Sequence, residues 1–230
     1  LMAKRGKKII LFLVEGMSDM VSLELIQKLN TSEDIKFQIT RGDVTTKPGI
    51  KVQNCILKVN ENISDFLRDS KLKKQDIISI THIVDTDGTY IPDENITAES
   101  SLAGFVYTTA GIKGPTIEAV SERNRSKKDV LEKLLNTSSI QGIPYKLYYM
   151  SCNLEHVLYD KLEIVSDDEK RSLSNEFADK FYGREREFIE FINNPIFKVE
   201  GDYKGTWDFI KQGLNSVNRY SNFHLFFEND

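Results

Sequence analysis

Carboxylate side chains follow two apolar runs of this chain, at the point where each run ends. Glu15 comes directly after the first run, with Asp19 four residues later, and Asp85 and Asp87 follow the second run. If both runs are strands of one parallel sheet, their carboxyl ends meet at one edge and the four side chains lie close together. Neighbouring carboxylates repel one another unless a cation lies among them, and hard oxygen ligands favour Mg2+ or Mn2+. The sequence therefore predicts a site for one or two divalent cations at this edge.

Each of these acidic residues also has a simpler, structural interpretation. Asp85 and Asp87 are two positions apart, so on an extended chain their carboxylates point the same way and can share a cation. The sequence Asp-Thr-Asp-Gly is also typical of a polar turn, and Asp19 could complement the dipole of a helix that starts there. Glu15 favours function, because a glutamate that ends an apolar run costs burial energy unless it is solvated or coordinated.

A third apolar run, residues 144–150, is followed by Asn153 and Glu155 at the same spacing. Glu155 is therefore expected to join the metal site. Alternatively, Asn153 caps a helix and Glu155 lies in its first turn. We expect His156 to be a hydrogen-bonded neighbour rather than a catalytic base.

Four positive charges within six residues could bind the phosphates of a nucleic acid. They are Arg123, Arg125, Lys127 and Lys128. A solvated helix start would explain them equally well. The formal net charge of -4 gives no general attraction to a polyanion, so nucleic acid would need such a local basic surface or metal ions. Trp207 could stack on a base, although a core position is the simpler interpretation.

Alternating strand and helix patterns must position these side chains. The apolar runs predict strands over residues 7–14, 35–40, 77–84 and 144–150. Helical spacing predicts helices over residues 18–29, 50–68, 127–135, 167–182, 185–193 and 203–214. Leu57 is expected to face inward from the second helix, and Ser126 to cap the third. This order predicts an α/β fold with a mostly parallel sheet flanked by helices.

We expect one globular unit with two parts. Residues 7–162 would form the core, with an irregular insertion at about 89–125, and residues 163–230 a mainly helical extension packed on it. The basic N-terminus leads into an apolar stretch that is too short to span a bilayer and lacks a small-residue cleavage site, so a cytoplasmic protein is expected. Cys55 and Cys152 lack metal-binding or redox spacing and are expected to be buried, reduced thiols.

The first two acidic motifs together resemble a known domain. Leu-Val-Glu-Gly-Met-Ser-Asp at 13–19, paired with Val-Asp-Thr-Asp-Gly at 84–88, resembles the TOPRIM domain of topoisomerases, bacterial primases, small RNA maturases and the overcoming-lysogenization-defect (OLD) nucleases. The resemblance implies a compact, Rossmann-like parallel sheet. It also implies three catalytic residues, with Glu15 in acid/base or metal work and Asp85 with Asp87 binding Mg2+.

The Glu-x-x-x-Asp form of the first motif is most similar to the OLD-like nucleases, which implies that Asp19 is also a metal ligand. Asn153-Leu154-Glu155 matches their last acidic pair only in part, since Asn153 replaces a carboxylate. The expected function is hydrolysis or nicking of nucleic-acid phosphodiesters by a metal-dependent endonuclease, with DNA favoured over RNA. The resemblance alone suggests phage defence or a mobile element. No Gly-x-x-x-x-Gly-Lys-[Ser/Thr] loop occurs, so ATP-driven activity would need an ATPase or other protein partner.

Two other functions remain open. The segment 83–89 also resembles the first motif of haloacid-dehalogenase-like phosphatases, which implies Asp85 as the nucleophile and Asp87 as the proton-transfer residue. That motif usually lies near the start of its domain, and the resemblance leaves Glu15 and Asp19 without a role. Alternatively, the chain is a non-catalytic TOPRIM-like subunit that binds nucleic acid or a partner, which the asparagine at 153 favours.

Overall fold

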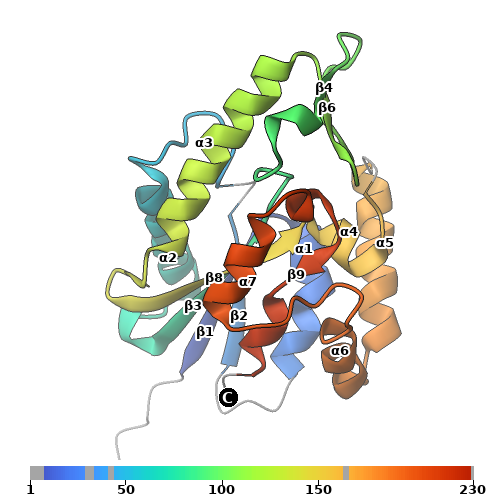
Figure 1. The fold of residues 1–230 in the computed structure, drawn as a ribbon. Helices are drawn as coiled ribbons and strands as arrows, with labels where there is room; N and C mark the ends of the chain where they lie inside the picture. Colours follow the sequence, from blue (N-terminus) through green and yellow to red (C-terminus); the bar gives the residue numbers. More distant parts are fainter. Residues whose placement is uncertain (1–7, 29–33, 41–43, 163–165, 229–230) are drawn as a thin grey trace, which may run out of the picture.

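A mixed β-sheet runs through the centre of the molecule (Figure 1). The computed structural model describes residues 8–28, 34–40, 44–162 and 166–228. The sheet follows the order β2-β1-β3-β8-β7, and β9 pairs with β8 beside this path. Its strands are β1 (Ile9–Val14), β2 (Asp34–Ile39), β3 (Ile77–Asp85), β7 (Ser139–Ile140), β8 (Ile143–Ser151) and β9 (Tyr220–Ser221). The pairs β1–β2, β1–β3 and β3–β8 are parallel, whereas β7 and β9 run antiparallel to β8. The predicted α/β fold with a mostly parallel sheet is confirmed.

Helices cover both faces of this sheet, because successive strand residues point to opposite sides. In β1, Leu11 and Leu13 pack into one apolar cluster, and Phe12 and Val14 into another. The first cluster lies under α2 (Cys55–Ser70), α3 (Ile117–Leu135) and α7 (Tyr203–Ile210). The second lies under α1 (Met17–Leu23), α4 (Leu154–Tyr159), α5 (Asp167–Phe181) and α6 (Glu185–Ile192). Figure 1 shows α2 and α3 on one side of the sheet and α1, α5 and α6 on the other.

The predicted second helix starts later than its apolar pattern indicates. It begins at Cys55 rather than at residue 50, and its buried positions are Cys55, Val59, Ile63 and Phe66. Leu57 is 55% exposed, so the prediction that it faces inward is wrong. With buried residues at 55 and 59, position 57 lies about half a turn away and faces solvent.

The expected irregular insertion contains regular structure. Short strands β4 (Ile96–Ala98), β5 (Val106–Thr108) and β6 (Gly111–Gly114) form a separate sheet, and α3 begins ten residues before its predicted start. Thr116 caps this helix by accepting a hydrogen bond from the Ala119 amide at 3.1 Å, so the prediction that Ser126 is the cap is wrong. The first half of α3 is largely polar, which hid its helical periodicity.

The two candidate caps of α3 give a direct stability test. Thr116→Ala should lower the free energy of unfolding by about 1 kcal/mol, because the Ala119 amide loses its acceptor. Ser126→Ala is the matched control and should be neutral or slightly stabilising, since Ser126 is exposed within the helix and alanine has the higher helix propensity. Urea unfolding of both variants measures the difference. A larger loss for Ser126→Ala would contradict the assigned helix start.

The C-terminal segment, residues 166–228, shares the core and the sheet. β9 pairs with β8, and Asn222 Oδ1 accepts a hydrogen bond from the Tyr149 amide at 3.0 Å. Trp207 is buried against the first cluster, as its core interpretation predicted. Cys55 and Cys152 are buried and free, which is also as predicted. Within the described part of the chain, no helix combines the length and the apolar character needed to cross a membrane.

Candidate metal centre

A cavity of about 420 Å3 opens at the carboxyl ends of β1 and β3, where the acidic motifs were predicted to meet. Four of its acidic lining residues come from three places in the chain: the turn after β1 and the start of α1, the end of β3, and the first turn of α4. They are Glu15, Asp19, Asp85 and Glu155. Helix α5 contributes Asp167, Lys170, Arg171 and Ser174 to the lining. The parallel sheet therefore gathers carboxylates from separate motifs around one space.

Backbone amides hold two of the carboxylates in place. Asp19 Oδ2 accepts a hydrogen bond from the Gly16 amide at 2.9 Å, which fixes it across the turn between β1 and α1. Asp85 Oδ1 accepts one from the Leu154 amide at 3.0 Å, which ties the end of β3 to the start of α4. Each carboxylate thus satisfies an exposed amide of a first helical turn while it faces the cavity.

The carboxylates lie close enough to disfavour one another's charge. Burial raises the pKa of Asp85 well above its ordinary value, and repulsion from the neighbouring acidic groups, Glu15 first and Asp87 second, adds to the shift. Burial also raises the pKa of Asp19 to about 6, with a smaller contribution from Glu155, although the hydrogen bond from Gly16 opposes it. A bound cation would offset this repulsion.

Lys170 already supplies one positive charge at the cavity. Its Nζ lies 2.8 Å from Glu155 Oε1, and the side chains are 40% and 6% exposed. Burial alone would lower the pKa of Lys170, but attraction to Glu155 and the hydrogen bond to it, with attraction to Asp85 and Asp19, together outweigh it and the net shift is upward. No sequence motif marks Lys170, because it reaches the strand ends through the packing of α5 against α1.

Asp87 is not one of the described residues that line this cavity, although it follows Asp85 by two residues and its charge acts on the Asp85 carboxyl. Its Oδ2 lies 2.7 Å from Lys127 Nζ. The sequence prediction assumed an extended chain, but Asp87 has a left-handed backbone with φ 48°. This turn breaks the alternation that would point Asp85 and Asp87 the same way. Asp85 lines the cavity whereas Asp87 pairs with Lys127, and the sharing of one cation between the two carboxylates stays a prediction.

The third motif supports its structural interpretation. Asn153 caps α4 by accepting a hydrogen bond from the His156 amide at 2.8 Å, so its side-chain oxygen already has a partner. His156 Nδ1 accepts from the Cys152 amide at 3.3 Å, as expected of a hydrogen-bonded neighbour. Only Glu155 of this motif reaches the cavity.

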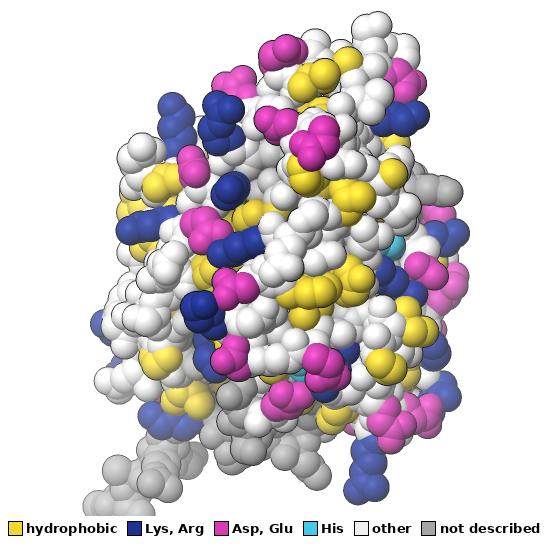
Figure 2. Space-filling model, in the orientation of Figure 1, with side chains coloured by type: hydrophobic (Ala, Val, Ile, Leu, Met, Phe, Trp, Pro, Cys, Tyr) yellow, Lys and Arg dark blue, Asp and Glu magenta, His cyan; other side chains and the backbone are white. Residues whose placement is uncertain are grey.

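The four predicted phosphate-binding cations do not form one surface. The Lys127 side chain is fully buried on Asp87, and Arg123 Nη1 donates to the Asp87 carbonyl at 2.8 Å. Arg125 and Lys128 are exposed, because they lie on other sides of α3 than Lys127, which faces Asp87. The face in Figure 2 mixes basic and acidic side chains over α3. The prediction that Lys127 contacts phosphates is therefore wrong, because its side chain is buried, whereas Arg125 and Lys128 remain exposed.

The donor set suits a hard cation, since it consists of carboxylate oxygens without thiolates. As these side chains stand, no three His, Cys, Asp or Glu residues of the described ranges converge closely enough to hold an ion together. The observation that supports a cation at this site is the repulsion among the carboxylates, which contributes to the raised pKa values of Asp85 and Asp19. A Mg2+ or Mn2+ ion among them would relieve this repulsion. Comparison of the chain with protein-family models, curated proteins and solved structures found no match.

Proposed function

We propose that the chain is a Mg2+- or Mn2+-dependent nuclease with a TOPRIM-like core, most similar to the OLD-like nucleases, that hydrolyses or nicks nucleic-acid phosphodiesters. The observation that carries this proposal is the cavity where Glu15, Asp19, Asp85 and Glu155 face Lys170 across one space. An acidic floor suits a divalent cation, and a cationic wall suits the phosphate that the cation would attract.

Each residue has a role in this proposal. A bound Mg2+ or Mn2+ would offset charge on the scissile phosphate and polarise the attacking water. Asp19, Asp85 and Glu155 would hold it in their ionised forms, and Glu15 would accept the proton of the water. Lys170 is partly exposed and would turn from Glu155 toward a phosphate oxygen.

The biological setting is proposed on the resemblance alone. Residues 7–162 would be the TOPRIM-like core and residues 163–230 its extension, in a cytoplasmic protein that acts in phage defence or on a mobile element. DNA is the proposed substrate in preference to RNA. Arg125 and Lys128 are exposed and could contact its backbone outside the cavity. Any ATP-driven step would come from a partner protein.

The phosphatase alternative needs Asp87 to transfer a proton beside the Asp85 nucleophile. Asp87 instead bonds to a buried ammonium, and its side chain is not one of those found to line the cavity. This arrangement favours the nuclease. Asn153 no longer favours the non-catalytic alternative, because it caps α4 and an asparagine is explained by that structural role.

Cleavage of supercoiled plasmid in Mn2+ tests the proposal. Glu15→Gln should reduce nicking by about 100-fold or more, because the amide cannot accept the proton of the water. Glu169→Gln is the matched control, since Glu169 is exposed in the first turn of α5, and it should nick at the wild-type rate. Nicking is measured by gel electrophoresis, with EDTA as the metal-free reference.

The same variants separate the alternatives. Phosphomonoester hydrolysis that survives Glu15→Gln but disappears in Asp85→Asn would overturn the nuclease in favour of the phosphatase. If plasmid, RNA and phosphomonoester all remain intact while Mn2+ still raises the unfolding midpoint, the protein is a binding subunit.

A further inference from the structure

We infer that Lys127 is a built-in cation for Asp87, which takes the place of a second metal ion, so that the acidic edge binds a single divalent cation. The inference rests on the proposed metal site and deepens it. It also removes Asp87 from the metal ligands that the sequence motif implies.

The ion pair itself is the first observation. Lys127 Nζ lies 2.7 Å from Asp87 Oδ2, and the two side chains are 0% and 19% exposed. A buried ammonium is stable only with a partner, because water no longer solvates it. Any metal ion bound by Asp87 would have to share this carboxylate with the buried ammonium of Lys127.

Hydrogen bonds fix the backbone of the loop that carries Asp87. The Asp87 amide donates to the Cys152 carbonyl at 2.8 Å, and the Gly88 amide donates to the Ser216 carbonyl at 3.0 Å. The Thr86 hydroxyl also donates to the Ser216 carbonyl, at 2.8 Å. These bonds link the loop to β8 and to the C-terminal segment, and they hold its backbone in the position that places the Asp87 carboxylate on Lys127.

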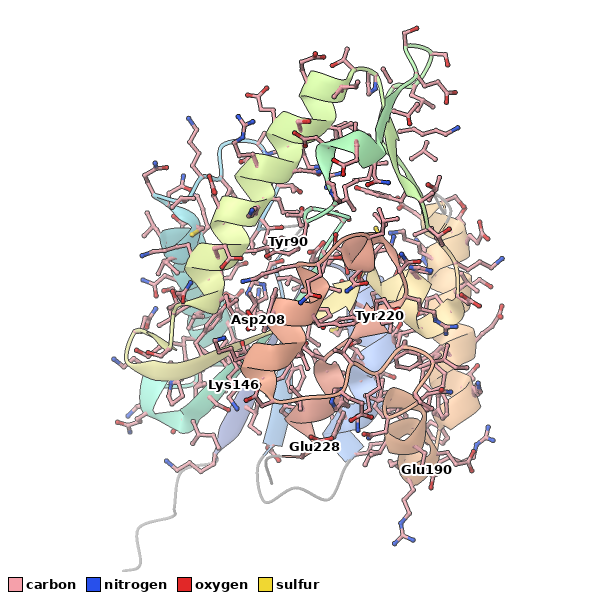
Figure 3. The ribbon with its side chains drawn as sticks, in the orientation of Figure 1. Tyr90, Lys146, Glu190, Asp208, Tyr220 and Glu228 are labelled. Carbon is pink, nitrogen blue, oxygen red and sulfur yellow. The ribbon has the colours of Figure 1, made fainter. Side chains whose placement is uncertain are left out.

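Gly88 allows this close packing. Its φ is +64°, and a Cβ at this position would lie 2.4 Å from Val217 Cγ1. Tyr90 continues the contact, since its amide donates to the Ser216 hydroxyl oxygen at 3.1 Å. Figure 3 shows Tyr90 between α3 and the C-terminal segment. The left-handed turn at 87 and 88 is thus held by Cys152 at the end of β8 and by Ser216 and Val217 of the C-terminal segment.

A second positive charge reinforces the exclusion. Arg123 Nη1 donates to the Asp87 carbonyl at 2.8 Å, and its guanidinium lies 4.9 Å from the centre of the Phe105 ring. A divalent ion at Asp87 would therefore meet two cations at short range, where like charges repel strongly in a partly buried site. Lys127 and Arg123 already offset the negative charge of Asp87.

The other lysine of the site behaves differently. Lys170 pairs with Glu155 at 2.8 Å, but 40% of its side chain is exposed. It can move into solvent when a metal ion takes Glu155. Lys127 has no exposed surface into which it can move. One lysine is therefore displaceable and the other is permanent, which leaves one position for a metal ion.

Manganese binding to the full chain tests this inference without depending on cleavage. Electron paramagnetic resonance counts free Mn2+, so titration gives the number of bound ions. The wild type should bind one ion, and Asp87→Asn should also bind one, with affinity within about threefold of the wild type. Asp85→Asn should bind at least about tenfold more weakly. The double variant Asp87→Asn/Lys127→Met, which removes both charges, should fold and also bind one ion.

Two results would overturn the inference, and they differ in what else they affect. Two ions on the wild type with one lost in Asp87→Asn would show that Asp87 is a metal ligand, while the proposed nuclease would survive. No ion on the wild type would remove both the inference and the metal-dependent function.

Discussion

Asp19→Asn should be more stable than the wild type at pH 7.5 in EDTA, by about 2–3 kcal/mol. The expected gain follows from the pKa of Asp19, which burial raises from 3.8 to about 6. Each pKa unit corresponds to about 1.4 kcal/mol of unfavourable charge in the folded state, and partial solvation reduces the total somewhat. Asparagine keeps the oxygen that accepts from Gly16 but carries no charge.

The gain should depend on pH in a definite direction. A carboxyl whose folded pKa is raised binds its proton more tightly when folded, so the wild type is relatively stable below the unfolded pKa and loses stability as pH rises. The difference between Asp19→Asn and the wild type should therefore open between about pH 4 and pH 6 and stay constant above pH 7. Urea unfolding at each pH measures it.

Manganese should reverse the order of stability. The ion stabilises only the folded wild type, and the variant has lost one of its ligands. Asp168→Asn is the control, because its side chain is 94% exposed and should change little at any pH. A variant that is less stable than the wild type in EDTA at pH 7.5 would contradict the proposed repulsion.

Charge repulsion among these carboxylates should lower the stability of the fold. The core could have placed apolar residues at these strand ends, as it does along β1, where every position is buried. Instead, Asp85 is buried there among other carboxylates, and burial first and then their repulsion raise its pKa. Such a cost is typical of functional sites, where stability is exchanged for binding or catalysis.

Local periodicity was sufficient to predict where Glu15 and Asp85 lie. Both end apolar runs, and a run of this kind in a β-α alternation becomes a parallel strand whose carboxyl end faces the shared edge. Glu155 followed from the same rule. For these residues the position along the chain determines the position in the sheet, so sequence alone could place them at one edge.

Asp87 and Lys170 could not be placed in this way. The position of Asp87 depends on a left-handed turn that is held by Cys152 and Ser216, and the second of these lies 129 residues away in the chain. Lys170 reaches the cavity through helix packing, without any motif of its own. Long-range contacts carry no periodic signal, so neither outcome was visible in the spacing of residues.

The insertion was misjudged for a different reason. Its strands β4 and β5 span three residues each, which is shorter than the alternation that a strand prediction needs. Their apolar residues pack on a small cluster that includes Ile112, Val120 and Val217. Because each segment contributes only single residues to this small core, none of the segments shows the periodic spacing of apolar residues from which a strand or helix is predicted.

Lys127→Met should be the most damaging of the substitutions considered at this site. It removes the ammonium from Asp87, whose side chain is only 19% exposed, and should cost about 3 kcal/mol of unfolding free energy. Asp87→Asn should cost about 2 kcal/mol, since the ammonium keeps a neutral oxygen as its partner. The double variant Asp87→Asn/Lys127→Met should cost less than the sum of the two, because neither partner is left with an unpaired charge.

This double-mutant cycle isolates the pair from other effects of each change. Urea unfolding of the four proteins should give a coupling energy of about 2 kcal/mol in favour of the native pair. Lys204 and Asp208 provide the control, because they lie at a similar distance of 2.8 Å but are 85% and 52% exposed. Lys204→Met should leave the unfolding midpoint unchanged within error. If the single losses simply add, Asp87 and Lys127 do not depend on each other, and the carboxylate is available to bind a metal ion.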